Sequence, residues 1–313
     1  MSAPHILATG RCMPVRVVTN DELSHQVDTT DEWVYSRTGI HSRHFCTDET
    51  GVSLAAAAAR QAMERAGVCA ADIGVCLVGT FTPDFASPST ACLLQGELGL
   101  EEDTLCFDLN AACAGFLYGL KTAHALLADA PRPCALVVGS EVISRVMDMT
   151  DRNTCVLFGD GAGAAVIRRD EDAEWHTVFG SRGDPSSIRV QGPGPIPSTI
   201  HMDGKSVFRF AVEVVEQSIR QLLEAEGLAS VNDLDLVVCH QANARIIDYV
   251  AKRLNTREGL FFKNMDRLGN TSAASIPIAL DELAEAGRLR PGMRILTVGF
   301  GGGLTWAGAL LRW

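Results

Sequence analysis

The sequence predicts an α/β protein made of two similar halves, and two repeated patterns carry this prediction. In the first pattern a long helix ends at a glycine, and a short linker with an aspartate leads into an apolar strand; residues 53–78 and 207–239 both follow it. In the second pattern an apolar strand is followed by a glycine-rich segment that turns apolar, at 135–167 and again at 294–310. Because both patterns recur in the same order, we infer an internal duplication of one α/β unit.

The duplication divides the chain near residue 170. We therefore expect an N-terminal half of residues 1–170 and a C-terminal half of residues 171–313. The stretch 168–200 is polar and rich in glycine and proline, above all in the run 192–197. That composition is typical of a long excursion over the surface rather than of core.

Length and composition are those of an ordinary globular protein. The 313 residues can bury a large core, and 47% of them are hydrophobic and 21% charged. The net charge of -11 argues against nucleic acid or an anionic membrane as a general partner. Ten scattered cysteines without a CxxC pair predict reduced thiols in a cytoplasmic protein, and we expect neither a signal peptide nor a membrane span.

The elements of the first half follow from local patterns. Residues 5–10 predict a strand and residues 31–34 a helical segment. The alanine-rich run 53–66 predicts a helix that ends at Gly67, because glycine readily adopts the left-handed conformation that closes a helix. The apolar run 73–78 then predicts a strand.

Cys113 lies between a short apolar strand, 104–109, and a helix-patterned run from Cys113 to about Leu127. Unpaired N–H groups and the positive end of a helix dipole favour a thiolate in the first helical turn, so we expect a Cys113 pKa below the ordinary value of about 8.5. The alternative is a buried, inert cysteine. The small neighbours that leave room for a substrate are Ala111, Ala112, Ala114 and Gly115.

In the second half, residues 207–226 predict a long helix ending at Gly227, and residues 234–239 predict an apolar strand. His240 follows this strand directly, and Asn270 opens a polar turn further on. Ligands of open α/β sheets bind at the carboxyl ends of strands, so both residues become candidates for chemistry beside Cys113. The alternative is a structural histidine and an ordinary turn.

Two glycine-rich runs could bind a substrate through the backbone. Residues 159–163 lead into a segment with the character of a strand and not of a helix, which excludes a dinucleotide-binding turn. Residues 301–303 follow a strand, where backbone N–H groups can approach a substrate oxygen as an oxyanion hole requires. The alternative for the second run is a tight turn at a sheet edge.

Together, these motifs closely resemble the β-ketoacyl-[acyl-carrier-protein] synthase III family, in an order and spacing that cover essentially the whole chain. The segments that carry the resemblance are 28–33, 37–40, 111–116, 158–164, 240–243, 269–275 and 300–306. The resemblance implies a thiolase-like fold, in which two duplicated halves stack as α-β-α-β-α layers. It also implies a homodimer.

By the same resemblance, Cys113, His240 and Asn270 form a catalytic triad that needs no metal and no organic cofactor. An acyl-CoA would acylate Cys113, and the backbone N–H groups of Cys113 and Gly302 would hold the oxyanion. Malonyl-[acyl-carrier-protein] would then lose carbon dioxide. Neutral His240 and the Asn270 amide would donate hydrogen bonds to the resulting enolate.

The resemblance further implies how substrates bind. The residues implied for CoA are Trp33, Arg37, Arg152 and Asn243, with the adenine held between the Trp33 ring and the Arg152 guanidinium. At Ser87, well-studied straight-chain members carry a bulky aromatic residue that lines the acyl pocket of the partner subunit. We therefore expect that the pocket of this protein accepts primers larger than acetyl.

A basic surface is expected for the acidic carrier protein. The helical pattern of residues 243–253 puts Arg245 and Lys252 on one face, directly after the His240 motif. Arg209 joins them by family resemblance. Against a net charge of -11, such a surface would attract an acidic partner.

We therefore expect an acyltransferase that initiates fatty-acid synthesis from a short acyl-CoA and malonyl-[acyl-carrier-protein]. One alternative is a specialised relative that condenses or transfers acyl groups in secondary metabolism. More distant alternatives are a Cys-His-Asn hydrolase and a non-catalytic partner subunit. The intact triad argues against the last, because an inactive copy need not keep it.

Overall fold

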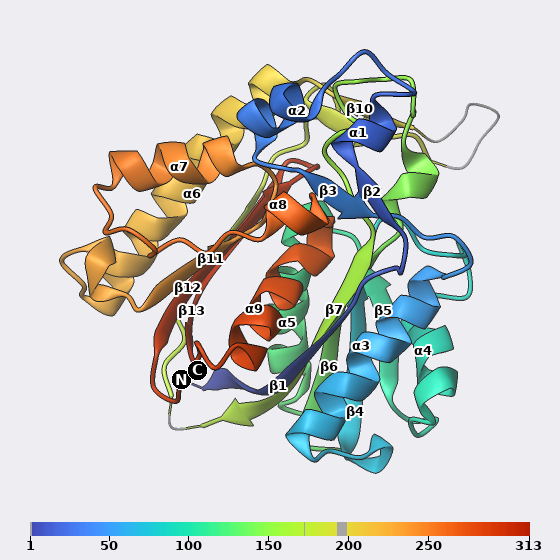
Figure 1. Cartoon of the computed structure of the whole chain (residues 1–313). Coiled ribbons are helices and arrows are strands. Elements are labelled where there is room, and N and C mark those ends of the chain that lie inside the picture. Colours follow the sequence, from blue (N-terminus) through green and yellow to red (C-terminus); the bar gives the residue numbers. More distant parts are fainter. Residues whose placement is uncertain (1, 172, 193–198) are drawn as a thin grey trace.

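The computed structural model describes residues 2–171, 173–192 and 199–313. Two β-sheets dominate the chain: a five-stranded sheet in the order β1-β7-β6-β4-β5 and a four-stranded sheet in the order β11-β12-β13-β8 (Figure 1). Their strands are β1 (Ala3–Cys12), β4 (Ile73–Gly79), β5 (Leu105–Leu109), β6 (Cys134–Glu141), β7 (Gly161–Asp170), β8 (Thr177–Ser181), β11 (Leu236–Cys239), β12 (Arg294–Gly301) and β13 (Thr305–Arg312).

Helices cover the outer face of each sheet and fill the space between the sheets. The outer helices of the five-stranded sheet are α3 (Gly51–Ala66) and α4 (Thr90–Leu98), and those of the four-stranded sheet are α6 (Gly204–Glu226) and α7 (Ala244–Arg253). The helices between the sheets are α5 (Gly115–Leu126) and α9 (Ser275–Glu285) (Figure 1). The predicted α-β-α-β-α layering of a thiolase-like fold is therefore confirmed.

The remaining elements are short. They are α1 (Asn20–Leu23), α2 (Asp31–Thr38), α8 (Met265–Leu268), β2 (Val17–Thr19), β3 (Ser42–His44), β9 (Ile188–Val190), β10 (Ile200–Met202) and the 3₁₀ turns η1 (Ala70–Asp72), η2 (Ala112–Ala114), η3 (Ile143–Val146), η4 (Val231–Asp233) and η5 (Ser272–Ala274). Turn η2 leads into α5 and turn η5 into α9, so the two middle helices start in the same way.

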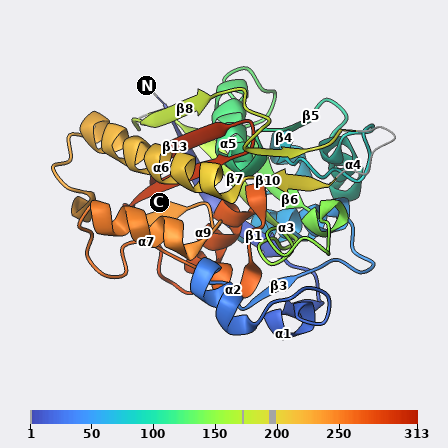
Figure 2. The same ribbon diagram turned by 90° about the horizontal axis from the view of Figure 1, so that it is seen from above.

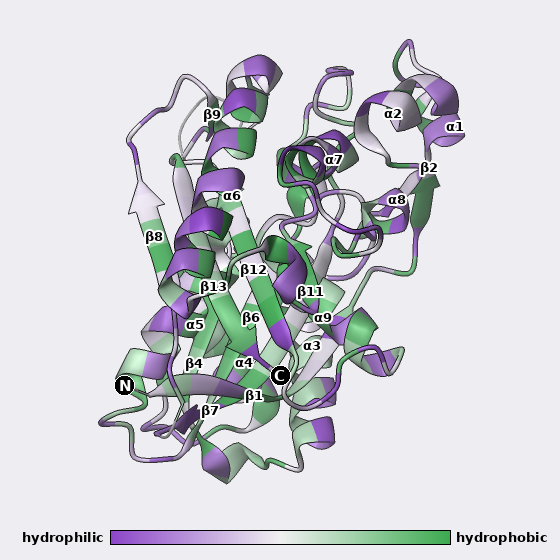
Figure 3. Cartoon of the chain, turned by 90° about the vertical axis from the view of Figure 1, so that its left-hand side faces the viewer, coloured by the Kyte–Doolittle hydropathy of each residue, from purple (hydrophilic) through white to green (hydrophobic). Residues whose placement is uncertain are grey.

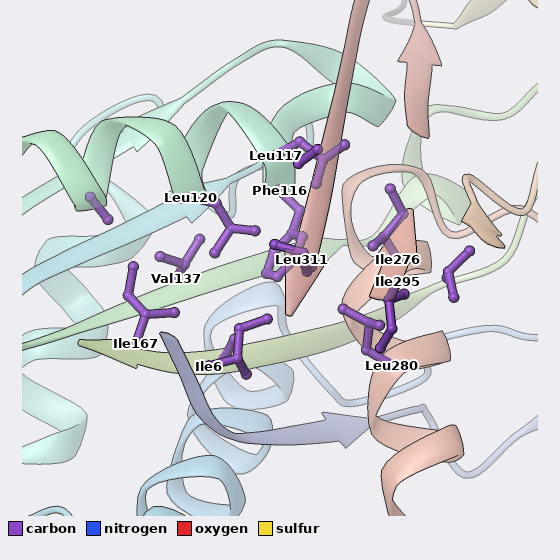
Figure 4. Packing of buried hydrophobic residues seen from close by; sticks show 14 of the residues in the cluster. Ile6, Phe116, Leu117, Leu120, Val137, Ile167, Ile276, Leu280, Ile295 and Leu311 are labelled. Atoms are coloured by element: carbon purple, nitrogen blue, oxygen red, sulfur yellow. The ribbon is translucent and has the colours of Figure 1, made fainter. Parts of the chain in front are cut away.

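The middle layer holds the largest shared core. Phe116 and Leu117 of α5 and Ile276 and Leu280 of α9 are fully buried or nearly so, and they pack with residues of both sheets such as Leu311 (Figure 4). Burying one such side chain contributes roughly 1.5–3 kcal/mol. The two sheets are thus held together by apolar contacts on both sides of the same pair of helices.

The long outer helices begin and end as the sequence predicts. Helix α3 ends at Gly67 with φ of 64° and α6 ends at Gly227 with φ of 72°, both in the left-handed region. The Asp203 side chain caps the first turn of α6 by accepting from the backbone of Lys205 and Ser206. Hydrophilic and hydrophobic bands alternate along the ribbon of α6, whereas β12 and β13 are largely hydrophobic (Figure 3).

A buried charge joins the middle layer to the first half. Asp281 of α9 has a fully buried side chain that accepts hydrogen bonds from Arg11 and Arg65, and from the Thr9 hydroxyl at 2.9 Å. Removing one member of such a buried group costs roughly 3–5 kcal/mol because its partners are left uncompensated. Asp281 therefore fixes how α9 lies against β1 and α3.

The expectation that residues 168–200 run over the surface is only partly right. Residues 192–197 of that stretch lie almost wholly outside the described residues. Thr177–Ser181, however, form β8, which pairs antiparallel with β13 and completes the four-stranded sheet. The residues of β8 are half-buried at a sheet edge, so the strand lacks the continuous apolar pattern that marks the inner strands.

Candidate active site

A single cavity of about 1170 Å³ contains most of the predicted site residues. Cys113, His240 and Asn270 all line it, although they come from η2, from the end of β11 and from the segment before η5. Helices α2, α6 and α7 contribute further walls, and the three lie next to one another when the molecule is seen from above (Figure 2). The fold therefore brings the three residues of the expected triad to one place.

Cys113 lies in η2, two residues before the start of α5 at Gly115, and is 8% exposed. Burial raises the pKa of its thiol to about 12, a nearby Ser272 hydroxyl opposes this shift, and the charge of Glu141 adds to it. The expectation of a lowered pKa is therefore wrong. The loss of water around a thiolate favours the neutral thiol and opposes the effect of the helix start.

Turns η2 and η5 have the same internal structure. In η2 the Asn110 side-chain oxygen accepts from the Ala112 backbone N–H at 3.1 Å, and in η5 Asn270 accepts from Ser272 at 2.9 Å. Ala112 and Ser272 both adopt positive φ, of 43° and 49°. Asn270 is thus the counterpart of Asn110 in the duplicated half. In the sequence, this correspondence is visible only as an asparagine two residues before Ala112 and another two residues before Ser272.

The hydrogen bond inside η5 fixes the direction of the Asn270 amide. Its oxygen is occupied by the Ser272 N–H, and its backbone is held by an N–H bond to the Leu157 carbonyl at 2.8 Å. The amide NH₂ group is left as the free end of a side chain that lines the cavity. Asn270 can therefore offer a donor to a bound molecule.

His240 is 1% exposed and faces the cavity from the end of β11. Burial lowers the pKa of its imidazole to about 3, so the ring is neutral at physiological pH. Its Nδ1 atom lies 2.7 Å from the Ser275 hydroxyl, and the ring packs edge to face on Phe300 with centroids 5.2 Å apart. These contacts fix the orientation of a neutral ring.

The glycine run packs directly against the sulfur. A Cβ atom on Gly301 would lie 2.9 Å from Cys113 Sγ, so only glycine fits there. Gly302 comes next, where a Cβ would lie 3.6 Å from the Ala112 Cβ atom. Gly301 lines the cavity, and this close approach of backbone to sulfur is what an oxyanion hole at Gly302 and Cys113 requires.

The residues expected to bind CoA gather at one part of the cavity. The Arg37 and Arg152 guanidinium carbons lie 4.4 Å and 4.7 Å from the centroid of the Trp33 ring. An aromatic base inserted between Trp33 and Arg152 would have to displace that guanidinium. Asn243 lines the cavity as well, but its amide also caps α7 at Arg245 and donates to the Arg37 carbonyl at 3.1 Å.

Of the expected carrier-protein residues, Arg209 and Arg245 line the cavity and are exposed. Lys252 is also exposed but lies further along α7, outside the cavity lining. Lys205, at the start of α6, lines the cavity and was not predicted. Ser87 is exposed in the segment between β4 and α4 and does not line the cavity of its own chain.

Three further polar residues near the site escaped the sequence analysis: Ser272, Ser275 and Glu141. The two serines belong to the motif 269–275, and Glu141 lies two residues after the apolar run 135–139, as the last residue of β6. Across the described residues no cluster of three histidine, cysteine or acidic side chains could hold a metal ion. Within the same ranges no helix is long and apolar enough to cross a membrane.

Comparison with known proteins gives one consistent result. The family described as 3-oxoacyl-[acyl-carrier-protein (ACP)] synthase III matches residues 107–183, and its C-terminal part matches residues 223–313. A β-ketoacyl-[acyl-carrier-protein] synthase III of Clostridium acetobutylicum is 43% identical, over 100% of this chain and 99% of the relative.

Solved structures agree. The 3-oxoacyl-[acyl-carrier-protein] synthase III of Aquifex aeolicus is 39% identical with a TM-score of 0.94, covering 99% of this chain and 100% of that one. The priming β-ketosynthase of the R1128 polyketide biosynthetic pathway is 38% identical with a TM-score of 0.93, covering 99% of this chain and 96% of that one.

Proposed function

This chain belongs to the β-ketoacyl-[acyl-carrier-protein] synthase III family, and we propose that it condenses a short acyl-CoA with malonyl-[acyl-carrier-protein]. It is an acyltransferase of the condensing type, which serves the initiation of fatty-acid synthesis. The observation that carries the assignment of residues is the common cavity of Cys113, His240 and Asn270. One nucleophile and two neutral donors around the same space suit a carbon–carbon bond formation through an acyl-enzyme.

In the first half-reaction Cys113 attacks the thioester carbonyl of acyl-CoA. The sulfur forms a bond to the acyl carbon, and the bond from that carbon to the CoA sulfur breaks. The negative oxygen of the tetrahedral intermediate lies beside the glycine run, where the backbone N–H groups of Cys113 and Gly302 stabilise it. Coenzyme A leaves, and the acyl group stays on Cys113.

In the second half-reaction the malonyl group loses carbon dioxide, and the electron pair forms an enolate of the carrier-protein thioester. Its oxygen accepts hydrogen bonds from the Asn270 NH₂ group and from the neutral His240 ring, whose pKa burial lowers to about 3. The enolate carbon attacks the acyl carbon on Cys113. The β-ketoacyl group leaves on the carrier protein, and the Cys113 sulfur is free again.

The cavity wall supports two different binding surfaces. We assign the adenine of CoA to Trp33 with Arg152 and Arg37, because both guanidinium groups already lie over that ring. We assign the acidic carrier protein to Arg209, Arg245 and Lys252, which are exposed around α6 and α7. Asn243 lines the same cavity, where its amide donates to the Arg37 carbonyl and accepts from the Arg245 N–H, and it would face the pantetheine arm.

Primer choice involves a second copy of the chain in this proposal. Ser87 is exposed and outside the cavity of its own chain, so it can reach an acyl group only across a homodimer contact. A serine in place of a bulky aromatic residue leaves space for primers larger than acetyl. Ser87→Phe should then shift relative kcat/KM toward acetyl-CoA by about 10-fold, since one methylene discriminates by about 1–3 kcal/mol.

We also propose that residues 1–170 and 171–313 are the two duplicated units, each carrying part of the site. Cys113 comes from the first unit and His240 and Asn270 from the second. The ten free cysteines of this chain suit a cytoplasmic enzyme, since thiols stay reduced there.

A second candidate is the priming of a specialised pathway, supported by the similarity to the R1128 priming β-ketosynthase. Both candidates are tested by incubating the protein with malonyl-carrier protein and a panel of acyl-CoA primers. Carbon dioxide release and the mass of the β-ketoacyl-carrier protein are measured, and Cys113→Ala is the control. Turnover of short primers supports the first candidate, turnover restricted to unusual primers supports the second, and absence of any condensation product contradicts both.

A further inference from the structure

Thr305, the first residue of β13, joins the glycine run to the turn that carries the nucleophile. Its hydroxyl oxygen lies 2.8 Å from the carbonyl oxygen of Ala111 and 3.0 Å from that of Gly302. A hydroxyl has a single proton, so the two carbonyls share one donor. Ala111 directly precedes η2, and Gly302 directly follows β12. One side chain therefore bridges two backbone segments that are far apart in the sequence.

The two bridged segments carry both backbone donors of the proposed oxyanion hole. One N–H group belongs to Cys113 in η2, two residues after Ala111, and the other belongs to Gly302 itself. The segments approach closely, because a Cβ atom on Gly301 would lie 2.9 Å from Cys113 Sγ and 3.1 Å from Cys113 N. Two donors stabilise one oxyanion only while both point at the same spot. The separation of the segments is therefore part of the site.

Other hydrogen bonds hold each segment from its own side. The Ala111 carbonyl also accepts from the Ala114 N–H at 3.1 Å, which is a bond inside the turn of the nucleophile. The Gly303 carbonyl accepts from the Asp184 N–H at 2.9 Å, a bond to the segment that follows β8. Within the described ranges, the hydroxyl of Thr305 makes the hydrogen bond that links η2 to the glycine run.

The duplicated half lacks this bridge. Strands β6 and β12 correspond in the duplication, and the strand register pairs Glu141 of β6 with Gly161 just as it pairs Gly301 of β12 with Thr305. Gly161 thus takes the place of Thr305 and has no side chain that could donate to η5. Strands β6 and β7 nevertheless pair along their length. The hydroxyl bridge is therefore a feature of the half-site around Cys113 and not a requirement of the strand pairing.

We propose that Thr305 is a positioning residue, whose hydroxyl holds η2 against the glycine run and keeps the N–H groups of Cys113 and Gly302 directed at one acyl oxygen. This inference rests on the proposed condensing function and adds to it a residue that lies outside the cavity lining. Thr305 does not touch the substrate and acts through the backbone. Binding of CoA at Trp33 and Arg152 should not depend on it.

The test is the single-turnover acylation of Cys113 by acetyl-CoA in the full chain, followed by intact-protein mass spectrometry. Thr305→Val keeps the shape of the side chain, but a methyl group cannot lie 2.8 Å from a carbonyl oxygen, since C–H···O contacts have C···O separations of about 3.3–3.6 Å. The two segments must then move apart. We expect acylation about 10-fold slower, which is less than the roughly 100- to 1000-fold loss that follows removal of a whole oxyanion-hole donor.

Two further variants isolate the hydroxyl. Thr305→Ala removes the hydrogen bond without added bulk, serves if the valine variant is unstable, and should slow acylation about 5-fold, as expected for one net hydrogen bond. Thr305→Ser restores the hydroxyl and should return the rate close to that of the wild type. In all three variants the acetyl-CoA concentration that gives half the maximal acylation rate should stay unchanged, because the residues assigned to CoA are untouched.

Thr297→Val is the matched control. Thr297 lies on β12 in the same hairpin, and its buried hydroxyl donates to the Ala309 carbonyl at 3.1 Å, outside the glycine run and the cavity lining. The control removes a buried threonine hydrogen bond of the same kind. It should lower the stability of the protein and leave the acylation rate at the wild-type value.

The infrared band of a ¹³C-labelled acetyl group on Cys113 separates positioning from a general loss of structure. Donors in an oxyanion hole polarise the acyl carbonyl and lower its stretching frequency, so the band should lie at higher frequency in Thr305→Val and keep its position in Thr297→Val. A wild-type rate and band in both Thr305→Val and Thr305→Ala, or an equal loss of rate in Thr297→Val, would overturn the positioning role alone. A wild-type protein that forms no acyl-enzyme would overturn the proposed function, and this inference with it.

Discussion

The Nδ1 atom of His240 and the hydroxyl of Ser275 are 2.7 Å apart in the interior of the protein. The backbone N–H of Gln241 points at the same hydroxyl oxygen from 3.5 Å, so the oxygen accepts there and its own proton is available for Nδ1. A neutral ring that accepts at Nδ1 carries its proton on Nε2. Ser275 thereby makes His240 a hydrogen-bond donor toward the cavity.

Ser275→Ala should therefore impair malonyl decarboxylation and leave acylation of Cys113 nearly intact. Without the serine proton, the ring can place its own proton on Nδ1 and lose the donor at Nε2. We expect a decrease of about 5-fold in carbon dioxide release, since one net hydrogen bond is worth about 1 kcal/mol. Ser275→Thr, which keeps the hydroxyl, is the control, and equal rates in Ser275→Ala and wild type would refute this role.

Asn270→Ala should also affect the second half-reaction more than the first. Its NH₂ group is the second donor to the enolate, and removing one such donor costs about 2.7–4 kcal/mol, or roughly 100- to 1000-fold in rate. Carbon dioxide release and acyl-enzyme formation are measured separately on the same protein. If both rates fell equally, Asn270 would have to act on the thiol or on the fold.

Arg245→Glu should raise KM for malonyl-carrier protein and leave acylation by acyl-CoA nearly unchanged. Arg245 is exposed at the cavity beside Arg209, and neither forms an ion pair with another described residue, so both are free to meet an acidic partner. Reversal of one rim charge is expected to raise KM by about 5- to 10-fold at low salt, and less at high salt. Arg290→Glu, an exposed arginine outside the cavity, is the matched control. An equal rise in KM for acyl-CoA would contradict the assignment.

Much of the fold could be read from the sequence because its signals are local. Apolar runs marked β4 and β11, and Gly67 and Gly227 marked the ends of α3 and α6, since a left-handed glycine closes a helix wherever it lies. Strand β8 was missed because an edge strand is only half-buried and has no clear alternation.

The site was predicted in its residues but not in its electrostatics. Cys113 precedes a helix as expected, yet the pKa of its thiol follows from the water that packing removes, which no local pattern reports. The close packing of β6 on η5 from the other half, where a Cβ atom on Gly139 would lie 2.3 Å from the Ala273 carbonyl oxygen, likewise joins residues far apart in the sequence. Contacts between duplicated halves come from the assembled fold.

His240 also links stability to pH. Its pKa is near 6.5 in an unfolded chain, and burial lowers it to about 3 in the folded protein. Between pH 6.5 and 3 the unfolded chain binds a proton that the buried ring does not bind. The stability that comes from the neutral, buried ring is therefore complete above pH 6.5 and is lost as the pH falls toward 3.

The comparison with His240→Gln isolates that contribution. As the pH falls below 6.5, the free energy of unfolding of the wild type should decrease relative to that of His240→Gln by about 1.4 kcal/mol per pH unit. Glu141, whose pKa burial raises to about 7, has the opposite slope, but it is present in both proteins and cancels. Urea unfolding from pH 4.5 to 8 measures the difference, and a constant value across that range would exclude a buried, neutral His240.

The central claim is that Cys113 carries the acyl group, and intact-protein mass spectrometry tests it most directly. The protein is mixed with acetyl-CoA or a larger acyl-CoA, digested, and the acylated peptide is identified before and after malonyl-carrier protein is added. We predict a mass gain of one acyl group on the peptide that contains Cys113, which malonyl-carrier protein removes. Cys113→Ala should show no gain, while Cys134→Ala, which changes another buried thiol, should show the full gain. An acyl group on the Cys113→Ala protein, or on a different residue of the wild type, would contradict the claim.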